Sequence, residues 1–306
     1  MNTEPLLVVG AVALIAGSLE RTGVKGGAGT GLREKAGEGA RFGSGNRGAR
    51  GGSRSARWAG RRDLNKLAVR APEKGRVIVG KAGRSLIAAE AGQSVLVVGP
   101  TQSRKTTGFA IPALLEWQGP VVAASVKSDL LSQTIEWRGS QGRTWIYDPT
   151  RSTGRRCSSW SPIDASKDWA GSRRTAASLT EVARSSAGTL TDGDFWYATA
   201  AKLLAPLLLA ASVSGGSMSD VVRWVDLQDV EEVESALSNA GEWAALQAAQ
   251  ATWARDPRQR SAVYSTAETV VDPFADPSVA ATSRRDASSI DPVSLLGGSN
   301  TLYICS

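Results

Sequence analysis

The 306-residue sequence contains no histidine and only two cysteines. Without histidine the chain has no His general base, no Ser-His-Asp triad and no His-ligated metal site. Cys157 and Cys305 are far apart in the sequence and form no CxxC motif, so they lack the spacing of a zinc site. We expect two buried or free thiols of a reducing compartment rather than a disulfide.

The overall composition favours a folded, basic protein. The net charge is +7, the pI is near 9.7, and 42% of the residues are hydrophobic, which is enough for a sizeable core. A chain of this length fits one large domain or two modest ones. Ten tryptophans accompany only four phenylalanines, and tryptophan is often structural, so this balance indicates no particular function.

One stretch organises the rest of the sequence. Residues 93–117 read QSVLVVGPTQSRKTTGFAIPALLEW. Ser94–Val98 is a short apolar run typical of a buried strand, and a glycine-started loop with a Lys-Thr pair follows it before a predicted helix. Strand, loop and helix in this order are the context of a phosphate-binding P-loop, whereas the alternative is a strand-turn-helix unit with a chance Lys-Thr pair.

In a P-loop, backbone N–H groups and the helix dipole favour an anion at one point. Lys105 is the candidate catalytic residue because its ammonium would reach the β- and γ-phosphates of ATP, and the Thr106 hydroxyl would ligate Mg²⁺. The predicted nucleotide-binding residues are Gly99, Pro100, Thr101, Gln102, Ser103, Arg104, Lys105, Thr106 and Thr107.

The loop departs from the pattern G-x-x-x-x-G-K-[ST] at one position, where Arg104 replaces the second glycine. Glycine there keeps the approach to the phosphates free of a Cβ atom. An arginine would crowd the nucleotide or force the loop into a costly conformation. Its charge would alternatively add a phosphate contact, so the sign of the effect is open, and so is ATP hydrolysis by this chain.

The first 60 residues differ from the remainder. Leu6–Leu19 carries no charge but is short for a membrane span, and the basic residues follow it rather than precede it. This pattern predicts a membrane-associated helix over 1–21, with the N-terminus outside and the bulk cytoplasmic; the alternative is a buried or frayed helix. Residues 22–60 are rich in glycine and arginine, and we expect a flexible, solvated linker with juxtamembrane charge; the alternative is that its arginines contact anionic lipid or nucleic acid.

Residues 61–165 predict the first part of an α/β core. A hairpin over 76–80 and 85–89 precedes the P-loop strand, and apolar runs over 120–126 and 144–147 indicate buried parallel strands separated by a helix. Ligands bind at the carboxyl ends of such strands. The remaining candidate residues at this edge are Lys127, Asp129 and Asp148, and the alternative for Lys127 and Asp129 is ordinary surface charge.

Residues 166–270 predict an all-α domain, because alanine and leucine recur there at helical spacing without a convincing strand. Asp-Pro dipeptides mark the boundaries that follow. Residues 271–306 return to the core and end in the strand-like run Thr301–Cys305.

Five segments together resemble the type IV secretion system coupling proteins, the TraG/TraD-like conjugative DNA-transfer ATPases. They read VLVVGPTQSRKTTGFAIPALLEWQGPVVAASVKSDLL, WIYDPT, DGDFWYATAAKLLAPLLLAA, DPRQRSAVYSTAETVVDPFADPSVA and IDPVSLLGGSNTLYICS. The resemblance runs from about Arg62 to Ser306. It implies a RecA-like P-loop NTPase core with an all-α domain, anchored in the cell membrane and using ATP and Mg²⁺, in which Gly99, Lys105 and Thr106 correspond to the P-loop.

The resemblance also implies partners: single-stranded DNA with its bound relaxase, the type IV secretion channel proteins, and further copies in a homo-hexamer. The family's acidic Walker B pair follows a strand beyond TLYIC, and no apolar run ending in Asp-Glu occurs in this sequence. We therefore expect an NTPase core that is truncated before the Walker B strand, which would weaken Mg²⁺ binding and leave apolar sheet edges exposed. The alternative function is a catalytically inactive, membrane-tethered fragment that binds DNA or partners without ATP turnover.

Overall fold

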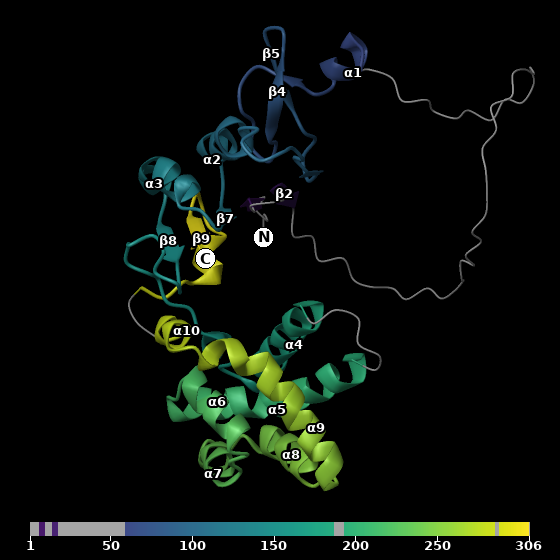
Figure 1. Ribbon diagram of the computed structural model, residues 1–306, viewed down its shortest axis with the longest axis vertical. Coiled ribbons are helices and arrows are strands. Elements are labelled where there is room, and N and C mark those ends of the chain that lie inside the picture. Colours follow the sequence, from purple (N-terminus) through teal and green to yellow (C-terminus); the bar gives the residue numbers. More distant parts are fainter. Residues whose placement is uncertain (1–5, 10–13, 18–58, 187–192, 285–287, 306) are drawn as a thin grey trace, which may run out of the picture.

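The computed structural model describes residues 6–9, 14–17, 59–186, 193–284 and 288–305. These residues form a mixed α/β arrangement in which two sheets with their helices lie on one side and a bundle of helices on the other (Figure 1). The predicted linker over 22–60 lies outside the described residues, apart from its last two positions.

The main sheet has six strands in the order β6-β2-β1-β7-β9-β8. Strands β7, β9 and β8 are parallel, β1 is parallel to β7, and β2 is antiparallel to both of its neighbours. The predictions of β7, β8 and β9 from their apolar runs are confirmed. The bounds are β1 Leu6–Val9, β2 Leu14–Gly17, β6 Ser94–Val95, β7 Val121–Ser125, β8 Thr144–Tyr147 and β9 Thr301–Cys305.

The N-terminal apolar run differs from its prediction. Instead of one helix over 1–21, the structure places Leu6–Val9 and Leu14–Gly17 in an antiparallel pair of strands, and Val8 pairs with Val122 of β7. The other residues of the predicted helix lie outside the described residues. A short apolar run suits a helix and a strand equally well, so the available edge of a sheet decides its conformation.

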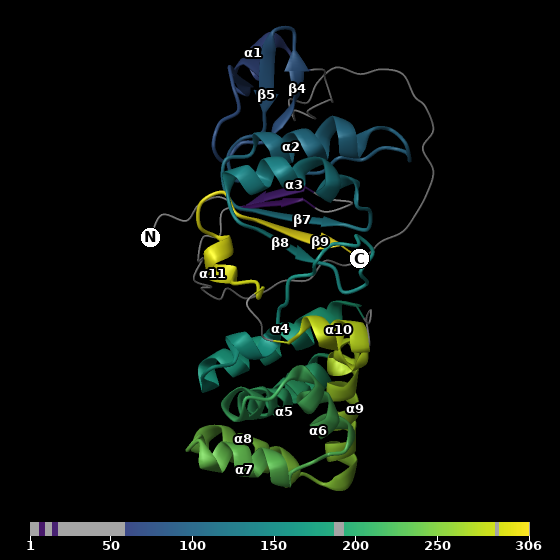
Figure 2. The same ribbon diagram turned by 90° about the vertical axis from the view of Figure 1, so that its left-hand side faces the viewer.

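Helices α2 (Ile111–Glu116) and α3 (Asp129–Gln141) cover one face of this sheet, and the short helix α11 (Pro292–Leu295) lies on the other (Figure 2). The apolar face of the sheet packs under α2 and α3 through buried side chains that include Leu114, Trp117, Val121 and Tyr303. A strand with neighbours on both faces needs an apolar sequence throughout, which is why the runs of β7 and β9 lack alternation.

A buried arginine joins the parts of this core. Arg138 of α3 is fully buried. It donates hydrogen bonds of 2.8 Å to the carbonyl oxygens of Trp117, Gly119 and Ser299 and to the hydroxyl of Thr301, and a longer one of 3.5 Å to Leu114. Burial lowers the pKa of Arg138, while the nearby Tyr303 acts in the opposite direction. The guanidinium therefore satisfies carbonyls at the end of α2 and before β9 that would otherwise be buried without partners.

The second sheet is small and precedes the P-loop in sequence. Its order is β3-β5-β4, with β4 and β5 forming the predicted antiparallel hairpin and Gly83 in the turn at φ +63°. The elements are α1 Arg61–Asn65, β3 Ala68–Val69, β4 Ile78–Ala82 and β5 Ser85–Ala88.

Helices and no strands occupy the described residues between 166 and 269, as the alanine and leucine pattern predicts. Their long central member, α5, packs against α4, α7, α8 and α9, and twelve of its 22 residues are buried. The bounds are η2 Pro162–Ala165, α4 Trp169–Ser186, α5 Gly193–Ser214, α6 Met218–Asp226, α7 Glu231–Asn239, α8 Trp243–Trp253, α9 Pro257–Val271, η3 Asp272–Ala275 and α10 Pro277–Thr282.

Within the described residues, α5 is the single helix long and apolar enough to cross a membrane. However, 67% of its most apolar window is buried inside the bundle, which is the property of a core helix in a folded domain. The Asp-Pro dipeptides mark helix starts: Asp256, Asp276 and Asp291 each accept backbone N–H groups at the first turns of α9, α10 and α11, with proline at the first helical position.

Candidate phosphate-binding site

The predicted P-loop leaves the sheet at the edge where a ligand is expected. Strand β6 is antiparallel to β2, which is antiparallel to β1, which is parallel to β7. Two reversals restore the direction, so β6 runs the same way as β7, β9 and β8. The loop that follows β6 therefore starts at the carboxyl edge of the parallel strands, which is the ligand-binding edge of open α/β sheets.

The strand before the loop is shorter and less buried than its sequence suggests. Only Ser94 and Val95 pair with β2, and the side chains of Leu96 and Val98 are 67% and 84% exposed. The predicted strand is confirmed only at Ser94 and Val95, and its predicted burial is wrong, because none of the five residues from Ser94 to Val98 is buried. Strand β6 lies at the end of the sheet, so its later residues have no second strand to cover them.

Lys105 folds back onto its own loop. Its ammonium donates hydrogen bonds of 2.7 Å to the carbonyl oxygens of Gly99 and of Pro100, and lies 3.5 Å from the hydroxyl of Ser103. Thr106 begins a π-helical turn, η1 (Thr106–Ala110), that continues directly into α2. Lys105 and Thr106 thus lie together at the start of a helix, as the P-loop pattern requires, and both are half-buried.

Arg104 has the backbone conformation that glycine favours. Its φ is +60°, in the left-handed region, where a side chain costs an L-residue about 1–2 kcal/mol. Gln102, two residues earlier, also has a positive φ of +64°. The side chain of Arg104 is exposed. Of the alternatives raised by the sequence, the geometry supports the costly loop conformation, because the backbone turns here as it would at the missing glycine.

Most of the other predicted loop residues are exposed. Pro100, Thr101, Gln102, Ser103 and Thr107 all face solvent, whereas Gly99 is half-buried. The Arg104 carbonyl accepts the N–H of Gly108, which joins the loop to η1.

Residues 51–304 match the family described as type IV secretory system conjugative DNA transfer. The chain belongs to this family. Two conjugal transfer proteins TraG from Escherichia coli are similar to it, one 26% identical over 131 residues (36% of this chain and 20% of the relative) and the other 32% identical over 74 residues (24% and 11%). The matched stretches thus span a fifth or less of these relatives. The family places the chain among the coupling proteins of conjugative type IV secretion.

The other candidates at the carboxyl edge of the sheet differ from one another. Lys127 and Asp129 are exposed around the start of α3 and make no side-chain ion pair among the described residues, which agrees with the surface-charge alternative. The N–H of Lys127 donates to the hydroxyl of Ser125, 3.1 Å away.

Asp148, by contrast, is fully buried and its carboxylate is occupied by its own loop. It accepts hydrogen bonds from the hydroxyl of Thr150 and from the N–H and hydroxyl groups of Ser152 and Thr153, at 2.6–3.2 Å. Burial by itself raises the pKa of this carboxyl group, but the hydrogen bonds from Thr153, Ser152 and Thr150 outweigh it and the net pKa is lowered. Asp148 therefore orders the turn after β8 rather than facing a ligand.

The two cysteines are free thiols, as expected. Cys305 is buried at the end of β9, and burial raises the pKa of its thiol, with further contributions from Asp148 and Cys157. A thiol of raised pKa is a weak nucleophile, so this cysteine suits packing rather than chemistry.

Proposed function

We propose that this chain is an ATP-binding coupling protein of a conjugative type IV secretion system, which delivers single-stranded DNA with its relaxase to the channel. The observation that carries the proposal is the loop from Gly99 to Thr107 at the carboxyl edge of a parallel sheet, in a chain that belongs to the conjugative DNA-transfer family. Assembly as a homo-hexamer and contact with channel proteins are part of the same proposal.

The loop residues fit a phosphate-bearing ligand. The ammonium of Lys105 is held by two carbonyl oxygens through hydrogen bonds that an anion can replace, and such charge-assisted bonds to phosphate are stronger than bonds to neutral acceptors. The left-handed backbone at Arg104 turns the chain into η1, whose first N–H groups and hydroxyl come from Thr106 and Thr107.

In the proposed complex, Lys105 would hold the terminal phosphates and Thr106 would supply the hydroxyl ligand of Mg²⁺. Bound Mg·ATP would supply the phosphoryl group whose transfer drives DNA movement. The contribution of this chain's own residues is binding and orientation: Lys105 neutralises negative charge, and the peptide groups of Ser103 to Thr106 fix the phosphate position. Whether Arg104 adds a phosphate contact is tested by its replacement with glycine.

A second candidate is nucleotide or partner binding without turnover. The sequence contains no apolar run that ends in Asp-Glu. Among the described residues no group of three or more His, Cys, Asp or Glu side chains is placed to hold a metal ion. A loop that carries a side chain at the second glycine position favours weak or altered nucleotide binding.

Titration of a fluorescent ATP analogue with Mg²⁺ tests the proposal. Lys105→Ala should weaken binding at least about tenfold, because a charge-assisted contact to phosphate contributes roughly 1.5–3 kcal/mol. Lys81→Ala, which removes an exposed lysine of β4 in the second sheet, is the matched control and should bind like the unchanged chain. Equal affinity of the Lys105→Ala protein would refute the assignment of this loop.

Steady-state hydrolysis separates the two candidates. ATP turnover stimulated by single-stranded DNA and lost in Lys105→Ala supports the motor function. Binding of the analogue without turnover, with and without DNA, supports the second candidate.

The cellular location and domain limits extend the proposal. The family and the apolar run over 1–21 favour attachment to the cell membrane with the bulk cytoplasmic. We propose the boundaries 1–21, 22–60, 61–165, 166–270 and 271–306 for the membrane segment, linker, NTPase core, all-α domain and returning core. Liposome flotation of the full chain and of a chain lacking 1–21 tests the attachment: equal flotation of both would place it elsewhere.

A further inference from the structure

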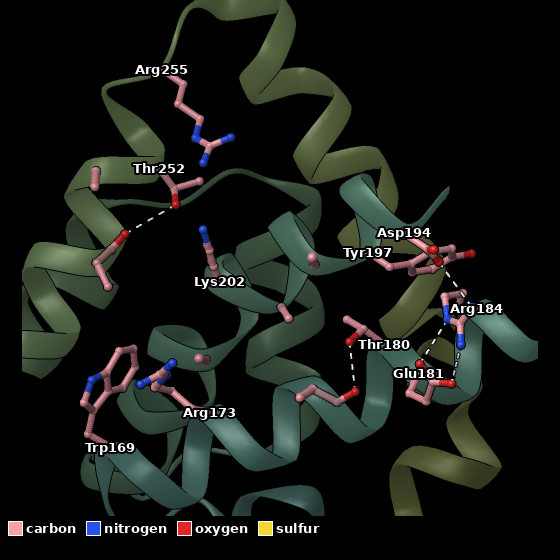
Figure 3. Close-up of a pocket in the computed structure, with 16 residues that line it drawn as sticks. Trp169, Arg173, Thr180, Glu181, Arg184, Asp194, Tyr197, Lys202, Thr252 and Arg255 are labelled. Carbon is pink, nitrogen blue, oxygen red and sulfur yellow. Dashed lines mark hydrogen bonds and ion pairs between the residues drawn. The ribbon is translucent and has the colours of Figure 1, made fainter. Parts of the chain in front are cut away.

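A cavity of about 860 Å³ lies in the helical bundle, far in sequence from the P-loop (Figure 3). Helices α4, α5 and α8 form its walls. Each helix contributes one stripe of residues at helical spacing, such as Ala198, Ala201 and Ala205 on α5. Small side chains recur on all three walls, and Ala198 of α5 and Ala251 of α8 are exposed despite their concave setting.

Cations from all three walls converge on this space. In the view of Figure 3, Lys202 of α5 lies between Arg173 of α4 and Arg255, which is in the bend that follows α8. None of the three side chains makes a hydrogen bond or an ion pair with a described residue. Arg173 and Lys202 are exposed and Arg255 is half-buried, so solvent screens their repulsion, while an anion that contacts them gains favourable electrostatic energy. The arrangement therefore favours a ligand with more than one negative charge.

The acidic side chains of the cavity do not provide this compensation. Glu181 and Asp194 both pair with Arg184, at the opposite end of the view in Figure 3. Tyr197, only 7% exposed, lines the same end, and its hydroxyl has no hydrogen-bond partner among the described residues. One end of the cavity is therefore basic, and at the other end the charge of Arg184 is already paired with Glu181 and Asp194.

The walls favour a helix over a nucleic acid strand. Single-stranded DNA binds on exposed aromatic faces with cations beside them. Here the ring of Tyr197 is buried and that of Trp169 is half-buried against the bundle core, so the cavity lacks a row of exposed aromatic faces on which successive bases could stack. Alanine walls instead let another helix approach closely, and aliphatic side chains of that helix fill the space between them.

We propose that the groove between α4, α5 and α8 binds an acidic, amphipathic helix of a partner protein. Aliphatic residues of that helix pack on Ala198, Ala201 and Ala251, and its carboxylates pair with Arg173, Lys202 and Arg255. The proposal goes beyond nucleotide binding and does not depend on it.

The test uses the full chain and fluorescein-labelled 18-residue peptides, monitored by fluorescence anisotropy. The first peptide carries a leucine stripe flanked by glutamates. The second has lysine in place of every glutamate, and a labelled oligothymidylate serves as the nucleic acid probe. We expect the glutamate peptide to bind, the lysine peptide to bind at least about tenfold more weakly, and added salt to weaken the glutamate complex.

Two sets of variants locate the site. Combined Arg173→Gln, Lys202→Gln and Arg255→Gln should weaken the glutamate peptide about tenfold, as expected for three partly screened ion pairs. Arg174→Gln is the matched control, since Arg174 is the next residue on α4, is exposed, and does not line the cavity. Ala251→Trp should block binding by filling the groove without a change of charge, whereas Ala244→Trp, also exposed on α8 but outside the cavity, should not.

Three results would overturn the proposal. The first is no binding of the glutamate peptide at 100 μM, about the weak end of useful peptide recognition. The second is equal loss of affinity in the cavity and control variants. The third is oligothymidylate binding that is tighter than the peptide and lost in the triple variant, which would make the groove a nucleic acid site instead.

Discussion

Replacement of Arg138 by methionine tests how the core between the main sheet and helices α2 and α3 is held together. The guanidinium donates to three carbonyl oxygens and one hydroxyl, each at 2.8 Å, in a site without exposure to solvent. Methionine keeps the length of the side chain and its packing but donates no hydrogen bond. The variant therefore isolates the hydrogen bonds from the volume of the residue.

The magnitude follows from the acceptors left behind. Each buried acceptor without a partner costs about 1–3 kcal/mol, and removal of one member of a buried polar set costs about 3–5 kcal/mol in comparable cases. The Thr301 hydroxyl can rotate to another acceptor, and removal of the buried charge returns part of the loss. We expect Arg138→Met to lower the free energy of unfolding by about 3–5 kcal/mol, a large fraction of the roughly 5–15 kcal/mol typical of a domain.

Urea unfolding followed by tryptophan fluorescence and far-UV circular dichroism measures this loss. Lysine has three donors on a narrower head group, so the free energy of unfolding of Arg138→Lys should lie between those of the unchanged chain and of Arg138→Met. Arg174→Met, at an exposed position of α4, is the control and should change stability by no more than about 0.5 kcal/mol. A loss below about 1 kcal/mol for Arg138→Met would refute the assignment of Arg138 as the residue that satisfies these carbonyls.

Two further predictions concern the loop and the edge of the sheet. Arg104→Gly should raise the free energy of unfolding in urea by about 0.5–1 kcal/mol, because it removes the left-handed strain at φ +60° but adds entropy to the unfolded state. The same variant should bind the ATP analogue more tightly. An unchanged affinity would show that the Arg104 side chain does not crowd the nucleotide. Because the folded pKa of Asp148 is lowered, its contribution to stability is complete above about pH 4 and is lost as the pH falls through the folded pKa. Asp148→Asn should therefore cost about 1–3 kcal/mol at pH 7 and progressively less in acid, and a pH-independent difference would contradict this account.

The sequence predicts the parts of the fold that depend on local pattern. Strands β7, β8 and β9 come from continuous apolar runs with two buried faces, and the helices between 166 and 269 come from the spacing of alanine and leucine. The Asp-Pro dipeptides predict a boundary at Asp256 and loops at Asp276 and Asp291, whereas the structure shows that each one begins a helix, because proline fixes the first turn and aspartate accepts its free N–H groups.

Features that depend on distant partners are not predictable in this way. Arg138 contacts Ser299 and Thr301, which follow it by more than 160 residues, and nothing near Arg138 in the sequence signals its burial. The cations of the groove come from α4, from α5 and from the bend after α8, so only the packed bundle brings them to one groove. At the candidate site, the sequence predicts the order of Lys105 and Thr106, but the hydrogen bonds of Lys105 to its own loop and the short β6 appear only in three dimensions.

The pairing order β6-β2-β1-β7 makes the N-terminus a spacer between the loop-bearing strand and the rest of the sheet. Within the described strands, β6 pairs with β2 and not with β7, so the hairpin formed by β1 and β2 separates the strand before Gly99 from the strand that ends at Ser125. A purification tag on the first seventeen residues, or a cleavage within them, therefore perturbs the loop. Nucleotide affinities measured on a shortened chain and on an extended chain compare sheets that are assembled differently.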